Sequence, residues 1–257
     1  ISVGPSSANI VSYGLDATGS FSGTSAPLAG VNSSQSKIRG MCWGKDGEHL
    51  YAAGQSNSNR VERFDLSTAY DITTASSAQT AALGSAMNAL QGIAISGDGT
   101  KFYATRSTSG AVGETIEYTM STPFDLSTLS ADRTVTAAST GNFSGGFVMD
   151  IFVSPDKSKL VIMSLGGDAS NGYQTILDEW PLTAGNITPI SGSTDRKTKN
   201  VSNSLGNTYD ASGDDSNVYS QGANFHPNGE VLVVVGVLMD DSPTNSSNQC
   251  HITRWTT

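Results

Sequence analysis

The sequence predicts an all-β protein built from repeated units of four antiparallel strands. Three observations lead to this prediction. Short stretches that alternate apolar and polar residues recur along the chain, and Gly-, Ser- and Thr-rich segments of the kind found in turns separate them. Asp-Gly or Asn-Gly pairs join several of these stretches, as tight β-hairpins require. The pattern occurs four times in 257 residues, which indicates a repeat architecture.

Each copy begins with two strands joined by a tight turn, over residues 38–54, 90–106, 148–164 and 220–236. Six residues before the Asp or Asn of each turn stands a reference position, occupied in chain order by Gly40, Gly92, Asp150 and Gly222. Glycine follows the Asp or Asn in three copies, but Lys157 follows it in the third. We therefore expect Gly99 and Gly229 at positive φ and a different turn geometry at Lys157.

A third strand with a central aromatic residue follows each hairpin, and the aromatics are Phe64, Tyr118, Trp180 and Trp255. A polar turn and a weaker Ser/Thr/Ala-rich strand come next, which completes four strands per unit. A further copy of the aromatic strand, at residues 10–18, opens the chain without a hairpin before it.

Four-stranded units whose reference positions are 52, 58 and 72 residues apart predict the blades of a β-propeller. The units run over residues 38–89, 90–147, 148–219 and 220–257, with an N-terminal half-repeat at 9–25, in a single domain of residues 1–257. The first strand of each unit should lie nearest the axis and the polar fourth strand outermost. The predicted core comprises Ile93, Ile95, Ile151, Val153 and Phe225, with their partners Phe102, Leu160 and Leu232.

The last unit stops after its third strand, which leaves one sheet edge without a partner. We expect a strand near residues 10–21 to pair there, placing Ile10, Val11 and Tyr13 against the last unit. This arrangement gives four blades in a closed ring. Five blades, or a part of a longer array, are the alternatives.

The repeat resembles the β-propeller repeats, with "PDGTKMY" hairpins and "YDLSTPWDISTA" tails, of surface and virion-associated proteins of marine bacteria and their phages. The resemblance covers residues 38–257 and is carried by SGDGTKFY (96–103), FDLSTAYDITTAS (64–76) and STPFDLSTLS (121–130). The third and fourth units depart from it. The resemblance implies a propeller in an extracellular or virion setting, and it implies no catalytic residue.

The net charge is −9 and the pI is about 4.6, which disfavours binding to nucleic acid or to an anionic membrane. The one basic cluster, residues 195–199, is expected to be a solvated loop. No stretch reaches 18 apolar residues, so membrane insertion is not expected. Cys42 and Cys250 form no disulfide scaffold, and Cys42 is expected to be a small buried apolar residue.

Propellers bind ligands at the mouth of the central channel. The residues at or just before the reference positions should line one mouth, and the candidate binding residues are Arg39, Gln91, Asp150 and Gln221. The competing interpretation, which we favour, is that these polar residues only hydrate a water-filled channel.

A catalytic or metal site is not evident. His49, His226 and His251 occupy non-equivalent positions in the repeat, and no nucleophile elbow or repeated carboxylate pair occurs. Asp210, Ser212 and Asp214 have the spacing that begins a calcium loop, but Gly is absent at the sixth position and Gln221 stands where a bidentate Glu belongs. We expect no cofactor, with calcium at this loop as the alternative.

These features predict a non-enzymatic structural or adhesive module, displayed outside the cell, on a cell surface or on a virion. Its partners would be other subunits of that assembly, and a protein or glycan as ligand. The alternative is a secreted lyase or glycosidase that acts on polysaccharide at the channel mouth.

Overall fold

The computed structural model describes residues 2–3, 9–12, 29–33, 38–54, 59–84, 87, 89–107, 113–136, 147–154, 156–168, 172–188, 197–200, 216–225, 231–240 and 249–256. After residue 188, and in most of the part before residue 33, the backbone alone is described. All sheets are antiparallel, as predicted.

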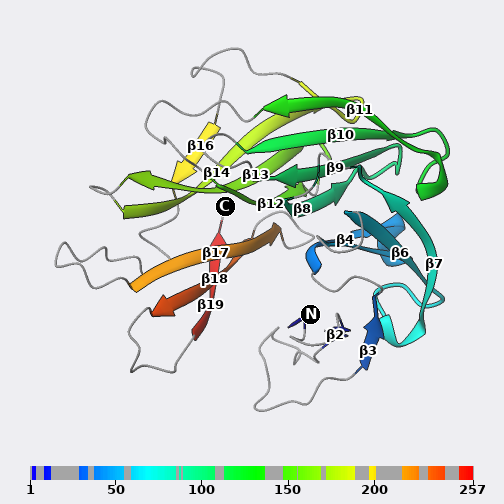
Figure 1. The fold of residues 1–257 in the computed structure, drawn as a ribbon, viewed down its shortest axis with the longest axis horizontal. Coiled ribbons are helices and arrows are strands. Elements are labelled where there is room, and N and C mark those ends of the chain that lie inside the picture. The colour runs from blue at the N-terminus through cyan, green and yellow to red at the C-terminus, as the bar shows by residue number, and fades with distance from the viewer. Residues whose placement is uncertain are drawn as a thin grey trace.

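Five sheets follow one another along the chain (Figure 1). The first two repeat units form four-stranded sheets: β4 (Ile38–Gly44), β5 (His49–Gly54), β6 (Arg60–Leu66) and β7 (Ala75–Ala82), then β8 (Leu90–Ile95), β9 (Lys101–Arg106), β10 (Glu114–Met120) and β11 (Leu129–Thr136). The third unit contains β12 (Phe147–Val153), β13 (Lys159–Asp168), β14 (Gly172–Thr183), β15 (Asn186–Ile187) and β16 (Lys197–Asn200). The fourth unit contains β17 (Ser216–Phe225), β18 (Val231–Asp240) and β19 (Gln249–Thr256). A separate N-terminal sheet contains β1 (Ser2–Val3), β2 (Asn9–Ser12) and β3 (Ala29–Asn32).

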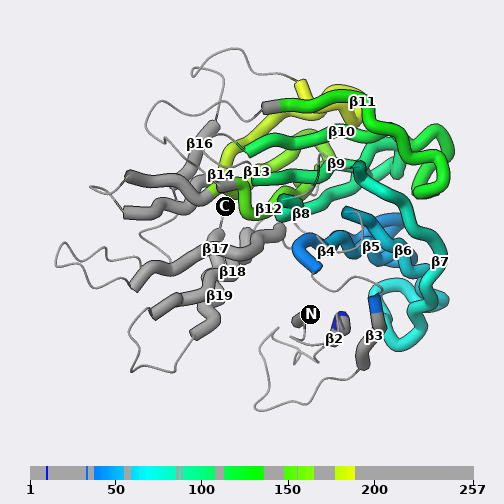
Figure 2. Tube along the Cα trace, in the orientation of Figure 1, coloured from blue at the N-terminus to red at the C-terminus, as the bar shows by residue number. Residues whose placement is uncertain are grey.

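The four repeat units are arranged as in a β-propeller. The first strand of each unit contacts the first strand of the next, in the order β4, β8, β12 and β17. In the first two units β7 and β11 form the outer edges, and Figure 2 shows the same succession of sheets along the chain trace. Most residues of β7 are exposed or half-buried, whereas β8 and β9 are almost wholly buried. The predicted gradient from an apolar inner strand to a polar outer strand is confirmed for the second unit, whose β11 is exposed or half-buried. In the first unit the inner strand β4 is largely half-buried and the second strand β5 is buried.

The reference glycines allow the inner strands to approach one another closely. A Cβ atom on Gly40 would lie 2.8 Å from the backbone nitrogen of Ile93, and one on Gly92 would lie 2.6 Å from Oδ1 of Asp150. Any larger residue at Gly40 would force two backbones apart. The glycines recur because neighbouring units meet at this position.

The residue before each reference position is a β-bulge. Pairing of the first and second strands skips one residue in every unit, and the skipped residues are Arg39, Gln91, Met149 and Gln221. A bulge leaves its residue outside the ladder and changes the direction of its side chain. These four positions align when the repeat units are compared with one another, and the bulge that they share explains why.

The turn of the third unit corrects one prediction. Gly99 has a φ of 72°, as expected, but Lys157 adopts the same left-handed conformation with a φ of 60°. The backbone nitrogens of both residues donate to a serine carbonyl three residues earlier, at 2.9 Å and 2.8 Å. The Asp and Ser side chains that build this turn are present in both units, so the geometry persists without glycine.

Neighbouring units are joined by the same contacts at two interfaces. The hydroxyl of Tyr51 donates to the carbonyl of Phe124 at 3.1 Å, and the equivalent Tyr103 hydroxyl donates to the carbonyl of Gly185. A side chain from the third or fourth strand of one unit also accepts a hydrogen bond from a backbone N–H of the next unit. Gln79 on β7 accepts from Leu126 at 2.9 Å, and Glu117 on β10 accepts from Ile187 at 2.9 Å. The polar turns of the second and third units therefore dock onto the unit before them.

The predicted core is largely confirmed. Ile93, Ile95, Ile151, Phe102 and Leu160 are buried. Val153 is half-buried, because the end of β12 faces an open cavity described below. The side chains of Phe225 and Leu232 lie outside the described residues.

The predicted pairing of the N-terminal strand with the last unit is wrong for the described strands. β2 pairs with β1 and β3, and Ile10 is buried in a cluster with Leu50 and Phe64 of the first unit. Among described strands, β19 pairs with β18.

β3 contacts the short 3-10 helix η2 (Ile72–Thr74), just as β7 contacts η4 (Leu126–Thr128). The N-terminal sheet thus contacts the turn of the first unit in the way that the first unit contacts the turn of the second. Val11 is described by its backbone alone, and Tyr13 lies outside the described residues.

The part of the basic cluster that is described forms a strand, not the expected loop, and residues 195 and 196 lie outside the described residues. Lys197–Asn200 form β16, which pairs with β14 so that Lys197 lies opposite Glu179. An acidic strand provides a favourable neighbour for this basic segment.

Candidate functional site

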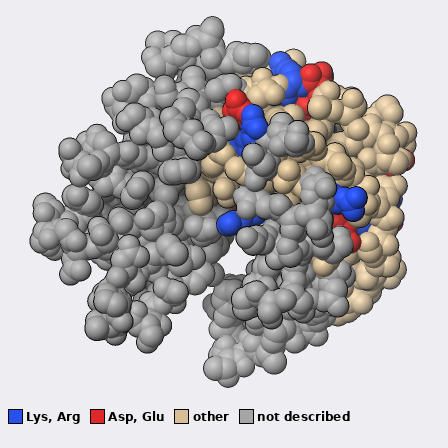
Figure 3. Space-filling view, in the orientation of Figure 1, with Lys and Arg blue, Asp and Glu red and all other residues tan. Residues whose placement is uncertain are grey.

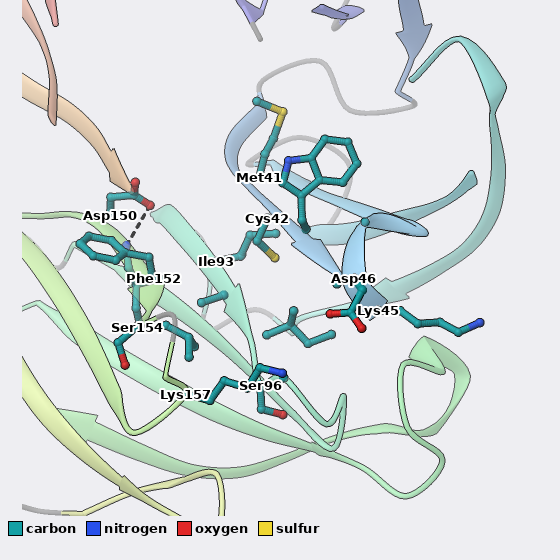
Figure 4. Close-up of a pocket in the computed structure, with 18 of the residues that line it drawn as sticks. Met41, Cys42, Lys45, Asp46, Ile93, Ser96, Asp150, Phe152, Ser154 and Lys157 are labelled. Atoms are coloured by element: carbon teal, nitrogen blue, oxygen red, sulfur yellow. Dashed lines mark hydrogen bonds between the residues drawn. The ribbon is translucent and has the colours of Figure 1, made fainter. Parts of the chain in front are cut away.

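A cavity of about 330 Å³ opens between the inner strands β4, β8 and β12 (Figure 4). The second halves of these strands and the turns that follow them form its walls. Each is the inner edge strand of its sheet, so part of its backbone N–H and C=O groups faces the cavity rather than a neighbouring strand. The cavity has the size of a small-molecule site.

One wall is aromatic. The rings of Trp43 and Tyr70 meet edge to face with centroids 5.3 Å apart, and Phe152 contributes a further ring from β12. Tyr70 is 61% exposed, which makes it the one large apolar side chain among the described residues that is mostly open to solvent. It also has a φ of 64°, a conformation that aromatic residues rarely adopt.

The polar lining contains both charge signs. Asp46 and Lys157 are exposed and come from the turns of the first and third units. Lys45 is also in the lining, but its Nζ lies 2.7 Å from the Glu48 carboxylate. The hydroxyls of Ser96 and Ser154 donate to the turn residues Asp98 and Asp156 at 2.6 Å and 2.5 Å, so these two hydroxyls are already engaged.

Asp150 lies at the inner end of the cavity. Its Oδ1 accepts a hydrogen bond of 2.8 Å from the backbone nitrogen of Ile151 (Figure 4). Cys42 is close by and half-buried, and both its burial and the negative charge of Asp150 raise the pKa of the thiol. The expectation that Cys42 is a small apolar residue fits this setting, because the thiol stays protonated and packs against the core.

The cavity and the predicted channel mouth lie at different ends of the inner strands. Arg39 is exposed and Gln91 is half-buried, and both stand at the beginning of their strands, away from the cavity lining. Of the four predicted binding residues, Asp150 is the one that lines the cavity. Gln221 is described by its backbone only, within β17.

The candidate calcium residues Asp210, Ser212 and Asp214 lie outside the described residues. Within the described part of the chain, no three His, Cys, Asp or Glu side chains are grouped so as to hold a metal ion. His49 is buried against Phe124, and this burial lowers its pKa. His226 lies outside the described residues, and His251 is described by its backbone alone.

Sequence reasoning missed Trp43 and Tyr70. Comparison of the units gave no clear signal for either residue, because the fourth unit also has an aromatic residue, Phe225, at the position of Trp43, and the second has Phe124 at the position of Tyr70.

Charged side chains on the visible face form small patches of mixed sign. Figure 3 shows Lys or Arg beside Asp or Glu in several places on the described surface, with no broad area of one sign. No helix in the described ranges is long and apolar enough to cross a membrane.

No protein-family model matches the chain, and no curated protein sequence matches it. Solved structures give weak similarities. A putative 6-phosphogluconolactonase from Bacteroides uniformis has 16% identity and a TM-score of 0.47, with 97% of this chain and 66% of that chain covered. The β-propeller domain of Cps50 (Swd1) from Myceliophteria thermophila has 10% identity and a TM-score of 0.46, with the same coverages. The chain thus spans just under two thirds of either protein, and the similarity is too low to assign a family.

Proposed function

We propose that the protein is a non-enzymatic binding module of an extracellular surface or virion, and that it binds a glycan in the cavity between β4, β8 and β12. The observation that supports this proposal is the pair of aromatic rings formed by exposed Tyr70 and half-buried Trp43, beside polar groups in a cavity of about 330 Å³. The surface or virion setting rests on the repeat sequence and on the acidity of the chain.

A sugar suits these walls chemically. Its faces carry C–H groups that pack on aromatic rings, while its hydroxyls need hydrogen-bond partners at the ring edge. The cavity offers both, since the rings of one wall face the same space as the Asp46 carboxylate and the backbone groups of three edge strands. A purely apolar ligand would leave those polar groups without partners.

An enzyme acting on polysaccharide is a second candidate, favoured by one observation. Two carboxylates, Asp46 and Asp150, line the same cavity, and glycosidases use two carboxylates. Oδ1 of Asp150 already accepts a hydrogen bond from the adjacent backbone. Release of reducing ends from polysaccharide distinguishes the two functions.

A glycan array tests the proposal, with isothermal titration of each ligand found. We expect ligands whose affinity falls at least tenfold in Tyr70→Ala, because the exposed ring can be removed without opening the core. Arg60→Ala provides the control, since Arg60 is exposed on β6 outside the cavity lining. The proposal fails if no glycan binds, or if Tyr70→Ala and Arg60→Ala bind equally well.

We also propose that the ring contains five sheets, with the N-terminal sheet between the first and last repeat units. The contact of β3 with η2 supports this arrangement, because it repeats the contact of β7 with η4. The four-blade ring closed by a strand added to β19 would need a different pairing of β2.

A further inference from the structure

The turn aspartate has a structural role in the second and third units. Oδ1 of Asp98 accepts hydrogen bonds from the Ser96 hydroxyl at 2.6 Å, and from the backbone nitrogen and hydroxyl of Thr100 at 3.0 Å and 2.9 Å. Asp156 accepts the same set from Ser154 and Ser158. In both units the carboxylate is occupied in building the turn.

The first unit lacks the residues that make these bonds. Gly44 replaces the serine before the turn, and Glu48 replaces the Thr or Ser after it. Neither replacement has a hydroxyl to donate, so Asp46 is released from the structural role. Figure 4 shows its carboxylate directed toward the cavity, whereas Lys45 extends away from it.

The backbone around Asp46 is unusual as well. Lys45 and Asp46 have φ values of 49° and 51°, and Tyr70, whose ring lies against Gly47, has a φ of 64°. Non-glycine residues in this region carry a conformational cost, and such residues concentrate at functional sites. Lys45, Asp46 and Tyr70 line the cavity, as does Lys157, whereas Asn59, Phe124 and Ala184, which also have positive φ, do not. The neighbouring cation, Lys45, is paired with Glu48.

We infer that Asp46 determines specificity in the proposed glycan site: its two carboxylate oxygens accept hydrogen bonds from adjacent hydroxyls of a sugar that packs on Trp43 and Tyr70. This inference rests on the proposed function. A carboxylate can accept such a pair of bonds but repels a second carboxylate. The site therefore selects uncharged sugars over the corresponding uronic acids.

Three matched pairs of disaccharides test the inference: glucose against glucuronate, galactose against galacturonate, and mannose against mannuronate. Titration of the wild-type chain should show, in at least one pair, that the neutral member binds roughly tenfold or more tightly than the acid. In Asp46→Asn the neutral sugar should bind more weakly and the acid more tightly, so the ratio approaches one. Asparagine tolerates the left-handed backbone, which keeps the turn intact.

Lys157→Met is the matched control, because it removes an exposed positive charge of the lining and should leave the ratio high. Equal binding of both members by the wild type, or an unchanged ratio in Asp46→Asn, overturns the inference while the glycan site itself stands. Loss of binding on addition of EDTA also overturns it, because Asp46 would then act through a metal ion. If no disaccharide binds, or if binding does not depend on Tyr70, both the proposed function and the inference fail.

Discussion

Replacing Glu117 by Gln should strongly destabilise the fold, although it replaces only one carboxylate oxygen by an amide NH2 group. Glu117 is fully buried in β10, and its carboxylate lies 3.2 Å from Nζ of Lys101 and 3.1 Å from Nη2 of Arg133. It also accepts the backbone N–H of Ile187 in the next unit at 2.9 Å. One side chain thus balances two cations and joins two units.

The magnitude follows from these contacts. Removing one partner of a buried ion pair costs about 3–5 kcal/mol. Glutamine keeps an acceptor for Ile187, and Asp132 still holds Lys101 at 2.9 Å, so we expect the lower end, about 3 kcal/mol. For a domain of this size, this loss corresponds to a decrease in Tm of roughly 6–12 °C.

Urea denaturation followed by circular dichroism measures the change in the free energy of unfolding. Glu114→Gln is the control, because Glu114 lies on the same strand and pairs with Arg106 but remains partly exposed. Glu114→Gln should lower the free energy of unfolding by less than about 1 kcal/mol. A Glu117→Gln variant within 0.5 kcal/mol of the wild type, on the order of a surface substitution, would refute the view that this carboxylate holds the second and third units together.

Further substitutions test other parts of the fold. Tyr103→Phe should lower the free energy of unfolding by about 1 kcal/mol, the net value of one hydrogen bond to the next unit, and an unchanged urea midpoint would argue against that contact. Ile95→Asp should abolish the cooperative melting transition, because it buries an unpaired charge; a normal transition would show that this position is not core. Gly99→Ala should destabilise and Lys157→Gly should stabilise, each by about 1 kcal/mol, since both positions have positive φ, and opposite signs in thermal melts would contradict this turn geometry. Serine hydroxyls lower the pKa of Asp156 to about 2, so its ionised form adds stability above pH of about 4 that is lost as the pH falls toward 2. The stability difference between wild type and Asp156→Asn should therefore shrink over that range in acid titrations, and a constant difference would rule this contribution out.

Much of the architecture was predictable because the repeat encodes backbone geometry. The alternation of apolar residues and the Asp-Gly turns predicted the strands, and the glycines at positions 40 and 92 marked where inner strands touch. The turn at Lys157 was mispredicted because residue identity at one position was given more weight than the Asp and Ser side chains that build the turn. The pairing of β2 was mispredicted because alternation shows that a strand exists but does not show which edge it joins.

The cavity was less accessible to sequence reasoning. The predicted binding positions were chosen because they are equivalent in all units, and equivalence selects residues with a structural task, here the bulges at Arg39 and Gln91. The cavity lining depends partly on differences between units, such as Gly44 and Glu48 in place of the hydroxyl residues of the second and third turns. Which of these differences face one space becomes clear only when three inner strands are placed side by side.

A crystal structure of the protein soaked with a glycan found on the array tests the central claim most directly. The account predicts sugar density between β4, β8 and β12, with a sugar face on the rings of Trp43 and Tyr70 and hydroxyls at Asp46. Density at the bulges of Arg39 and Gln91, at the opposite ends of the inner strands, or at a site outside the channel would contradict it.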